Sequence, residues 1–247
     1  MKTLLAISLW LLACGTAQAA VTPDATGSGE GTTSASYAHS IASDATLILV
    51  CLAERDTNAS GFTASSASVT VDGQAATQLI AVQDGTPQSR MVMFYKVAPS
   101  TGSVTISSTA DTGTERLVTA SLSLKGAATS STFNTATSNS SLGSTDADVN
   151  TIASASGEFG VLCGASLTAA SSASADATTP VSTEQLDIAH TDATSVRNWI
   201  YTEDGAASSI DMRVNLASSV RWSAVAVSIR AAASPSSTRH RGVVLLP

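Results

Sequence analysis

The stretch RWSAVAVSIR (221–230) nearly repeats the stretch RLVTASLSLK (116–125), at an offset of 221 − 116 = 105 residues. In both stretches apolar residues recur at alternate positions, which is the period-two pattern of a β-strand. The alternation places Val225 and Val227 on one face of the later strand, and we expect that face to be buried. A strand that recurs in this way favours an all-β fold with an internal duplication.

Three other segments of the first half have counterparts in the second half, in the same order. The pairs are TLILVCLA (46–53) with EFGVLCGAS (158–166), MFYK (93–96) with NWIYTED (198–204), and SVTI (103–106) with SIDMRV (209–214). This alignment places Cys163 on Cys51 and Tyr201 on Tyr95. Because neither half alone can bury its strands, we expect one β-sandwich domain built from two pseudo-repeats. Independent reuse of Val, Ala and Ser in unrelated strands is the alternative interpretation.

Four motifs follow one another along the chain. They are a buried early strand (LILVCLAE, 47–54), a Gly turn (VTVDGQAAT, 69–77), an aromatic-Tyr strand running into Pro and Gly (MFYKVAPSTGSVTI, 93–106), and the closing RWSAVAVSIR strand. Their order resembles a widespread family of secreted bacterial and viral β-sandwich modules that end in a Trp-x-Ala-Val-Ala-Val strand. The resemblance covers roughly residues 34 to 231 and implies a jelly-roll-like antiparallel β-sandwich. It implies no activity, because these motifs form strands and turns.

The N-terminal residues 1–19 have the features of a signal peptide. Lys2 precedes an apolar run, and Ala17-Gln18-Ala19 predicts cleavage before Ala20. The alternative is a lipobox, because LLAC is followed by Gly, and this would place a lipid on Cys14. No other segment approaches the about 20 apolar residues of a membrane span. We therefore expect a secreted, extracellular protein without a transmembrane span, or one that is lipid-anchored at the cell surface through Cys14.

The predicted sandwich domain covers residues 37–231. Residues 20–36 are rich in Gly, Ser and Thr and lack periodicity, which predicts a flexible leader. Pro235 cannot extend a central strand, so residues 232–247 are predicted to form a C-terminal tail. Inside the domain, Asp72-Gly73 lies between two extended segments and predicts a hairpin turn, because both residues tolerate positive φ angles.

Composition and charge limit the classes of partner. Charged residues make up 13% of the 247 residues, against about 25% in a typical soluble protein. The formal net charge is −7, and no basic patch is visible in the sequence. A nucleic-acid partner is therefore not expected. Glycans, or proteins of a cell or virion surface, are the partners that fit an extracellular sandwich.

Catalysis is not predicted. The chain has three histidines, His39, His190 and His240, and His190 has Asp187 and Asp192 nearby in the sequence. A Ser-His-Asp site is recognised by its geometry, and in a chain this rich in Ser, proximity in the sequence carries little information. The sequence also lacks the G-x-S-x-G motif of a nucleophile elbow.

Two weaker patterns suggest ligand sites. Asp146, Asp148 and Asn150 occupy alternate positions, so on a strand their oxygens would share a face and could hold Ca²⁺. A solvated strand edge is the favoured interpretation, and no other cofactor is expected. Trp199 and Tyr201 also share one side of a strand and could form a sugar-binding platform, although core packing is the commoner use of such rings.

The cysteine count is even once the signal peptide is removed, leaving Cys51 and Cys163. An oxidising compartment favours a disulfide between them, and a duplicated fold could bring equivalent residues together. Two free thiols packed as small hydrophobic groups are the alternative.

The sequence favours an extracellular, non-catalytic protein that acts in surface display, adhesion or assembly. A carbohydrate-binding module is the first alternative, and an extracellular polymer hydrolase is the second.

Overall fold

The computed structural model describes residues 20–56, 62, 66–84, 88–168, 171–175, 182–192 and 196–233. The predicted signal peptide, the lipobox cysteine Cys14, and residues 234–247 of the predicted tail lie outside these ranges. Within them the chain is all-β and antiparallel, as predicted. No helix with the length and apolarity of a membrane span occurs in this described part.

The strands divide into two sets along the chain. The first half contains β1 (Thr22–Gly31), β2 (Ser34–Ile41), β3 (Ala45–Arg55), β4 (Ser68–Val71), β5 (Gln74–Ala75), β6 (Thr77–Gln83), β7 (Ser89–Val97), β8 (Gly102–Thr109) and β9 (Arg116–Lys125). The second half contains β10 (Phe133–Ala153), β11 (Phe159–Ser166), β12 (Ala173–Ala175), β13 (Thr183–Ala189), β14 (Arg197–Asp204) and β15 (Ser209–Ile229).

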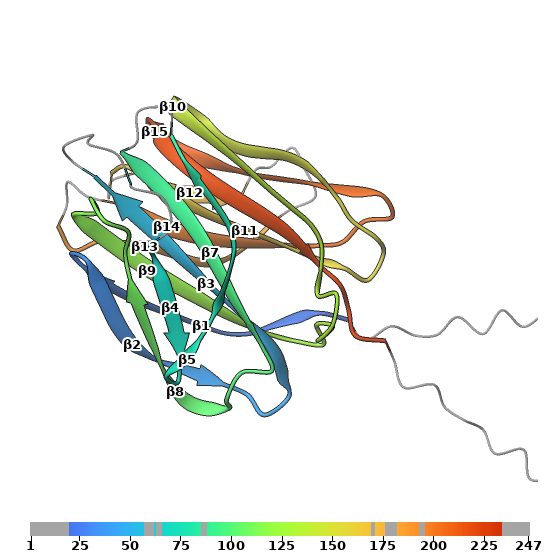
Figure 1. Cartoon of the computed structure of the whole chain (residues 1–247). Coiled ribbons are helices and arrows are strands. Elements are labelled where there is room, and N and C mark those ends of the chain that lie inside the picture. The colour runs from blue at the N-terminus through green and yellow to red at the C-terminus, as the bar shows by residue number, and fades with distance from the viewer. Residues whose placement is uncertain are drawn as a thin grey trace, which may run out of the picture.

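The two large sheets have the same strand order. One sheet runs β1-β9-β3-β7-β6, and the other runs β10-β15-β11-β14-β13 (Figure 1). Each strand of the first sheet therefore has a counterpart in the same place in the second sheet, with β3 and β11 at the two centres. This equivalence supports the internal duplication predicted from the sequence.

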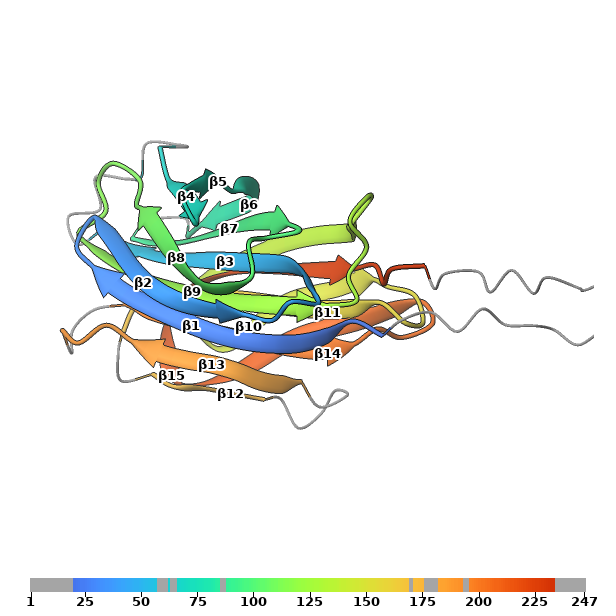
Figure 2. The ribbon, with the colours of Figure 1, turned by 90° about the horizontal axis from the view of Figure 1, so that it is seen from below.

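Each half adds an outer layer to its large sheet. In the first half this layer is a separate sheet with the order β2-β8-β4-β5. In the second half β10 and β15 are long enough to form both layers, because residues 146–153 of β10 pair with residues 209–215 of β15, which also pairs with β12. Figure 2 shows β4 and β5 on one side of the molecule and β12 on the opposite side, with the large sheets between them.

Three apolar clusters separate these layers. The central core lies between the two large sheets and contains the alternate residues Val118, Ala120, Leu122 and Leu124 of β9. Val225 and Val227 lie in the same core and are fully buried, so the predicted face of the closing strand is confirmed. The other two clusters fill the space between each large sheet and its outer layer.

The strand registers correct one detail of the sequence alignment. Cys51 pairs with Met93 across β3 and β7, and Cys163 pairs with Ile200 across β11 and β14. If the cysteines are equivalent, Ile200 corresponds to Met93, at an offset of 200 − 93 = 107 residues.

Tyr201 therefore corresponds to Phe94, and its predicted alignment with Tyr95 is wrong by one residue. A slip of one residue moves a side chain to the opposite face of the sheet. Tyr95 packs against the central core, with its ring centroid 4.8 Å from that of Phe133, whereas Tyr201 lies in the outer core of the second half.

The prediction of a flexible leader over residues 20–36 is wrong, because β1 and the start of β2 occupy this stretch. Its glycines permit close packing of β1 on aromatic side chains of β2. A Cβ atom on Gly27 would lie 2.7 Å from His39 Nδ1, and one on Gly29 would lie 2.5 Å from a ring carbon of Tyr37. The Gly-rich composition thus fits an ordered strand that pairs with β9.

The turn between β4 and β5 agrees with the prediction. Asp72 and Gly73 have φ angles of 50° and 72°, and they connect strands paired through Val71 and Gln74. Positive φ at both central residues is what a type I′ hairpin turn requires.

Candidate functional site

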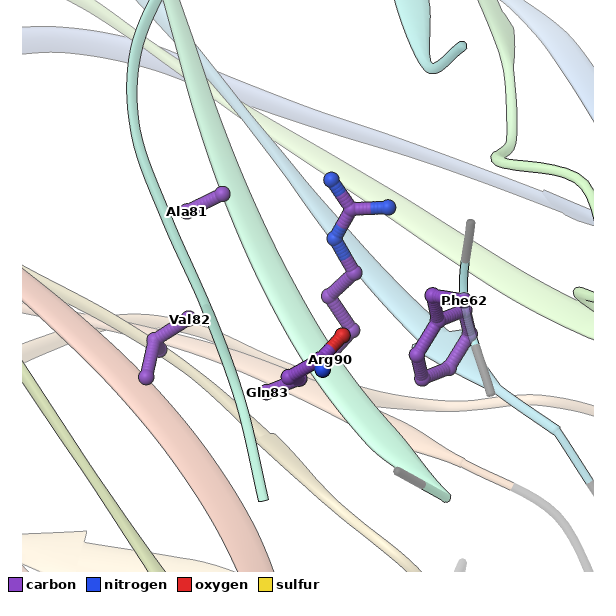
Figure 3. A pocket seen from close by; sticks show the side chains of 5 residues that line it. All are labelled: Phe62, Ala81, Val82, Gln83 and Arg90. Atoms are coloured by element: carbon purple, nitrogen blue, oxygen red, sulfur yellow. The ribbon is translucent and has the colours of Figure 1, made fainter. Parts of the chain in front are cut away.

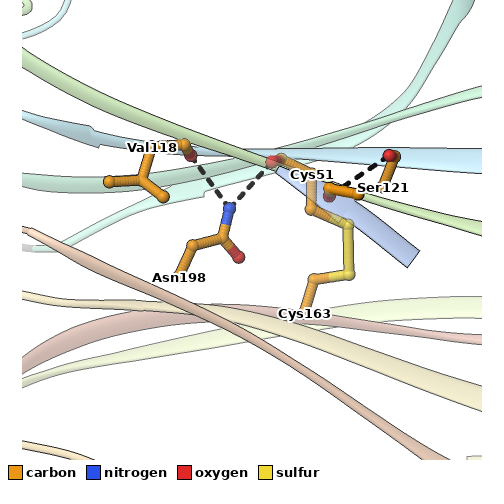
Figure 4. The surroundings of a disulfide bond; sticks show 6 residues. Cys51, Val118, Ser121, Cys163 and Asn198 are labelled. Atoms are coloured by element: carbon orange, nitrogen blue, oxygen red, sulfur yellow. Dashed lines mark hydrogen bonds between the residues drawn. A yellow bond between two sulfur atoms is a disulfide. The ribbon is translucent and has the colours of Figure 1, made fainter. Parts of the chain in front are cut away.

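A disulfide joins the centres of the two large sheets. It links Cys51 of β3 to Cys163 of β11, and their Cα atoms are 6.3 Å apart (Figure 4). Both residues are fully buried in the central core. The structure therefore contains the pairing that the sequence left open, and it places the bridge between equivalent positions of the two halves.

Asn198 makes a second polar connection between the sheets. Its side chain extends from β14, and Nδ2 donates hydrogen bonds to the carbonyl oxygens of Cys51, at 2.8 Å, and Val118, at 2.9 Å. Asn198 is fully buried, so these bonds form away from water. Together, the disulfide and Asn198 fix how the two large sheets face one another, and we call this arrangement the central clamp.

The predicted sugar platform is wrong, because Trp199 and Tyr201 are fully buried. Their ring centroids are 6.3 Å apart at an interplanar angle of 68°, and the Tyr201 hydroxyl donates to Glu184. Gly164 lies opposite Trp199, and a Cβ atom there would fall 1.9 Å from the indole ring. Trp199 therefore fills the space that a side chain at residue 164 would take. These aromatic residues form the outer core of the second half.

The candidate Ca²⁺ residues lie beside an arginine. Asp148 Oδ1 accepts a hydrogen bond from the amide of Asn150, whose φ is 67°, and Arg213 is 3.7 Å from Asp148 and 2.6 Å from Asp211. Register shifts of β10 lie on both sides of this segment, between Ser144 and Asp146 and between Asp148 and Thr151. In the described residues, no group of three or more His, Cys, Asp or Glu is arranged to hold a metal ion. Ca²⁺ binding stays a prediction without a defined ligand set.

His190 connects β13 to the first half. Its Nδ1 accepts a hydrogen bond from the amide of Asp192, and its Nε2 is 3.2 Å from the carbonyl oxygen of Gly31. Asp187, the predicted neighbour of His190, forms an ion pair with Arg197 of β14. His190 thus connects the backbone of the loop after β13 to the last residue of β1. His240 lies outside the described residues.

His39 belongs to a buried polar network that also contains Asp24, Ser121 and Ser123. His39 Nδ1 is 2.9 Å from Ser121 Oγ, His39 Nε2 is 3.1 Å from Ser123 Oγ, and Ser123 Oγ donates to Asp24 at 2.9 Å. Burial lowers the pKa of His39, and the Asp24 carboxylate opposes this only in part. His39 is 2% exposed, so the network holds β1, β2 and β9 together and is closed to a substrate in solution.

A buried charge cluster lies at the far end of β3 and consists of Glu54, Arg90 and Asp111. Arg90 is ion-paired with Asp111 and lies 3.6 Å from Glu54, and the amide of Asp111 donates to Glu54 at 3.0 Å. All three residues are at most 5% exposed. One guanidinium faces two carboxylates, and burial raises the pKa of Glu54 to about 7 against the opposing effect of Arg90.

A cavity of about 230 Å³ adjoins this cluster, and we call it the Phe62 cavity. It is lined by Phe62, Ala81, Val82, Gln83 and Arg90 (Figure 3). The Arg90 guanidinium carbon lies 5.8 Å from the centre of the Phe62 ring, within the range of a cation–π contact. The cavity thus combines an aromatic ring, an amide and a buried charge cluster, which together could hold a small polar ligand.

Sequence reasoning missed both the charge cluster and the His39 network. Their members come from segments that are far apart in the sequence, and the strand pairing of the folded chain brings them together. The available signal was Glu54, a charged residue at the end of the apolar strand LILVCLAE.

A comparison of the chain with protein-family models, curated proteins and solved structures finds no significant match. The resemblance to secreted sandwich modules therefore stays a prediction.

Proposed function

We propose that this protein is an extracellular, non-catalytic structural module that acts in surface display, adhesion or assembly. The observation that carries the proposal is the disulfide of the central clamp, which is fully buried and joins equivalent strands of two equivalent sheets. Structural disulfides form and persist in oxidising compartments. The bridge therefore supports export, and we propose that the signal peptide is cleaved after Ala19, as its sequence predicts.

The character of the surface also supports this role. Leu142, 55% exposed, is the one large hydrophobic side chain that is exposed among the described residues. Strand β10, at an edge of the second large sheet, consists mostly of Ser, Thr, Asn and Asp. Hydroxyl and amide groups form hydrogen bonds with hydrated, polar partners. Glycans, or proteins of a cell or virion surface, are the partners we propose.

Thiol blocking of the exported protein tests whether Cys51 and Cys163 are joined in an oxidising compartment. Without reductant, alkylation under denaturing conditions should add no mass to the mature chain, and with reductant it should add two alkyl groups, on Cys51 and Cys163. The Cys51→Ala/Cys163→Ala variant is the control and should take up none in either case. Two blocked thiols in the unreduced protein, or retention inside the cell, would contradict the proposal.

Binding measurements test the role itself. The mature chain should bind a glycan array, bind intact cell or virion surfaces, or self-associate in sedimentation. It should release no products from extracellular polymers. Hydrolysis of such a polymer, or the absence of every association, would overturn the proposed function.

The Phe62 cavity favours carbohydrate binding as a second candidate function. Sugars pack against aromatic rings and accept hydrogen bonds from amides, and the cavity offers Phe62 and Gln83 for these contacts. At about 230 Å³ it is smaller than the roughly 300–1,000 Å³ of typical ligand pockets, so it fits a single sugar ring. Gln83→Ala should weaken binding in a glycan array, whereas Gln78→Ala, on the exposed part of the same strand, should not.

A further inference from the structure

A second cavity, of about 260 Å³, lies where the described chain begins, and we call it the N-terminal cavity. It is lined by Ala20, Val21, Gly157, Glu158, Asp204 and Gly205. Val21 is 4% exposed and packs in the central core, whereas Ala20 is exposed. The chain therefore enters the folded body between these two residues, directly after the predicted cleavage site.

Backbone contacts fix the position of Ala20. Gly126 has a φ of 71°, and a Cβ atom on it would lie 2.4 Å from the carbonyl oxygen of Ala20. Two residues later, Thr22 pairs with Lys125 at the start of the ladder between β1 and β9. Ala20 is thus held against the turn that follows β9, beside the cavity that it lines.

Two acidic residues, Glu158 and Asp204, also line the cavity. Glu158 is largely buried, and its Oε2 accepts hydrogen bonds from Ser228 Oγ, at 2.7 Å, from Asn134 Nδ2, at 3.0 Å, and from a backbone amide. Asp204 is exposed at the end of β14. Burial raises the pKa of the neighbouring Glu203 to about 7, and the negative charges of Asp211 and Asp204 add to this shift. Acidic side chains are thus gathered at the end of β14, at residues 203, 204 and 211.

Two basic side chains lie near this region without lining the cavity. Arg230 Nε is 3.8 Å from Glu158 Oε1, on a side chain that is 42% exposed. Lys125 is engaged by two aspartates, at 2.9 and 3.5 Å. The cavity lining itself therefore contains two carboxylates and no basic side chain.

We propose that the N-terminal cavity binds the α-ammonium group of Ala20 that signal-peptide cleavage creates. The proposal rests on the proposed secretion of the protein. Hydrolysis breaks the bond between the carbonyl carbon of Ala19 and the nitrogen of Ala20. Water supplies the hydroxyl of the new Ala19 carboxyl group and a proton to the Ala20 amine, which is protonated further to an ammonium at neutral pH. Maturation thus exchanges a neutral amide for a positive charge at a residue that lines the same cavity as Glu158 and Asp204.

The test compares two forms of the mature chain released from a cleavable fusion, one starting at Ala20 and one extended by Gly-Ser before Ala20. Titration of ¹³C-labelled Ala20 by NMR should place the α-amine pKa above its usual value of about 7.7–8.0. A pKa raised by folding means stability that is present at low pH and lost as pH rises through the raised value. The Ala20 form should therefore melt about 2–4 °C above the extended form at pH 6.5, and the two should converge above pH ~10.

Asp204→Asn removes one carboxylate from the lining without disturbing the hydrogen bonds of Glu158. It should lower the α-amine pKa toward the usual range and reduce the difference in melting temperature. Asp72→Asn, the same change at the exposed β4–β5 turn, is the matched control and should alter neither. A normal α-amine pKa together with equal melting of the two forms would overturn the proposal.

N-terminal sequencing of the exported protein separates this proposal from the one on which it rests. If the exported chain starts at Ala20 but the amine titrates normally, the binding of the ammonium is refuted and secretion stands. If the protein is not exported, the proposed function fails, and if it starts at another residue, the cleavage assignment fails and with it this proposal.

Discussion

The two halves of the molecule fill equivalent places with different side chains. In the first half, Leu52 of β3 lies opposite Val92 of β7, and both pack in the outer core. The equivalent pair in the second half is Gly164 of β11 opposite Trp199 of β14. Glycine, which has no side chain, thus takes the place of Leu52, and tryptophan, the largest residue, takes the place of Val92.

This difference shows that the shared strand order is compatible with different residues, provided that the two side chains paired across neighbouring strands fill a similar combined volume. Protein cores tolerate exchanges that conserve volume and pattern far better than exchanges that add or remove atoms. In the central core, by contrast, the two halves keep cysteine at the equivalent positions 51 and 163, because a disulfide needs both partners. The outer cores could therefore diverge while the contact between the halves was retained.

The largest expected effect comes from giving the second half the residue of the first. Gly164→Leu should destabilise the fold by at least about 5 kcal/mol, because a Cβ atom there would meet the Trp199 ring at 1.9 Å. Adding Trp199→Val should recover much of this loss, which urea unfolding of the two single variants and the double variant would measure. Gly143→Ala, where the nearest atom would be 3.6 Å away, is the control. If the changes in unfolding free energy of the two single variants simply add up in the double variant, the side-chain volumes at 164 and 199 do not compensate each other.

Removal of the central disulfide tests the connection between the halves. Cys51→Ala/Cys163→Ala should lower the free energy of unfolding by about 4–5 kcal/mol, the chain-entropy value for a sequence separation of 112. Reductant should destabilise the parent protein and leave the double variant unchanged in the same urea titration. Equal stability of the parent with and without reductant would show that the bridge contributes nothing.

The equivalent arginines Arg90 and Arg197 differ in how deeply their ion pairs are buried. Arg90→Met should cost about 3–4 kcal/mol near pH 7, because it leaves Glu54 and Asp111 buried without their cation. Arg197→Met should cost about half as much, because its ion pair with Asp187 is closer to solvent, with 17% of the Arg197 side chain exposed against 6% for Arg90. Chemical unfolding of both variants at one pH measures the comparison, and similar losses at the two sites would remove the distinction.

The pH dependence of Glu54 has the smallest expected effect. Its folded-state pKa is raised to about 7, so its contribution to stability is present below the unfolded value of 4.5 and is lost as pH rises through about 7. Glu54→Gln lacks this titration and should gain roughly 1–3 kcal/mol relative to the parent between pH 4 and pH 8. Urea unfolding across this range measures the difference, and parallel pH profiles would indicate that Glu54 titrates normally.

Much of the fold could be predicted from local pattern. The alternation in the strand ending at Ile229, the Asp72-Gly73 turn and the order of the repeated segments are properties of short stretches of sequence. Strand β1 could not be predicted in this way, because TPDATGSGEG has no apolar alternation. Its order depends on pairing with β9 and on the rings that pack over Gly27 and Gly29.

The candidate sites were harder to predict for the same reason. Trp199 and Tyr201 share a strand face as expected, but whether that face is open depends on an outer layer supplied by distant parts of β10 and β15. The charge cluster likewise requires the register that brings Glu54 opposite Arg90. Period-two patterns predict which side chains share a face, and they contain no information about what covers it.

The direction of β3 determines how a tethered molecule would be oriented. Its first residue, Ala45, pairs with Lys125, next to Gly126, and Gly126 contacts both Ala20 and Ala232. Its other end carries Glu54, beside the Phe62 cavity, about 30 Å away for a strand of this length. Attachment close to Ala20 or Ala232 would therefore hold one pole of the molecule at the anchoring surface and point the opposite pole, with its cavity, toward the surroundings.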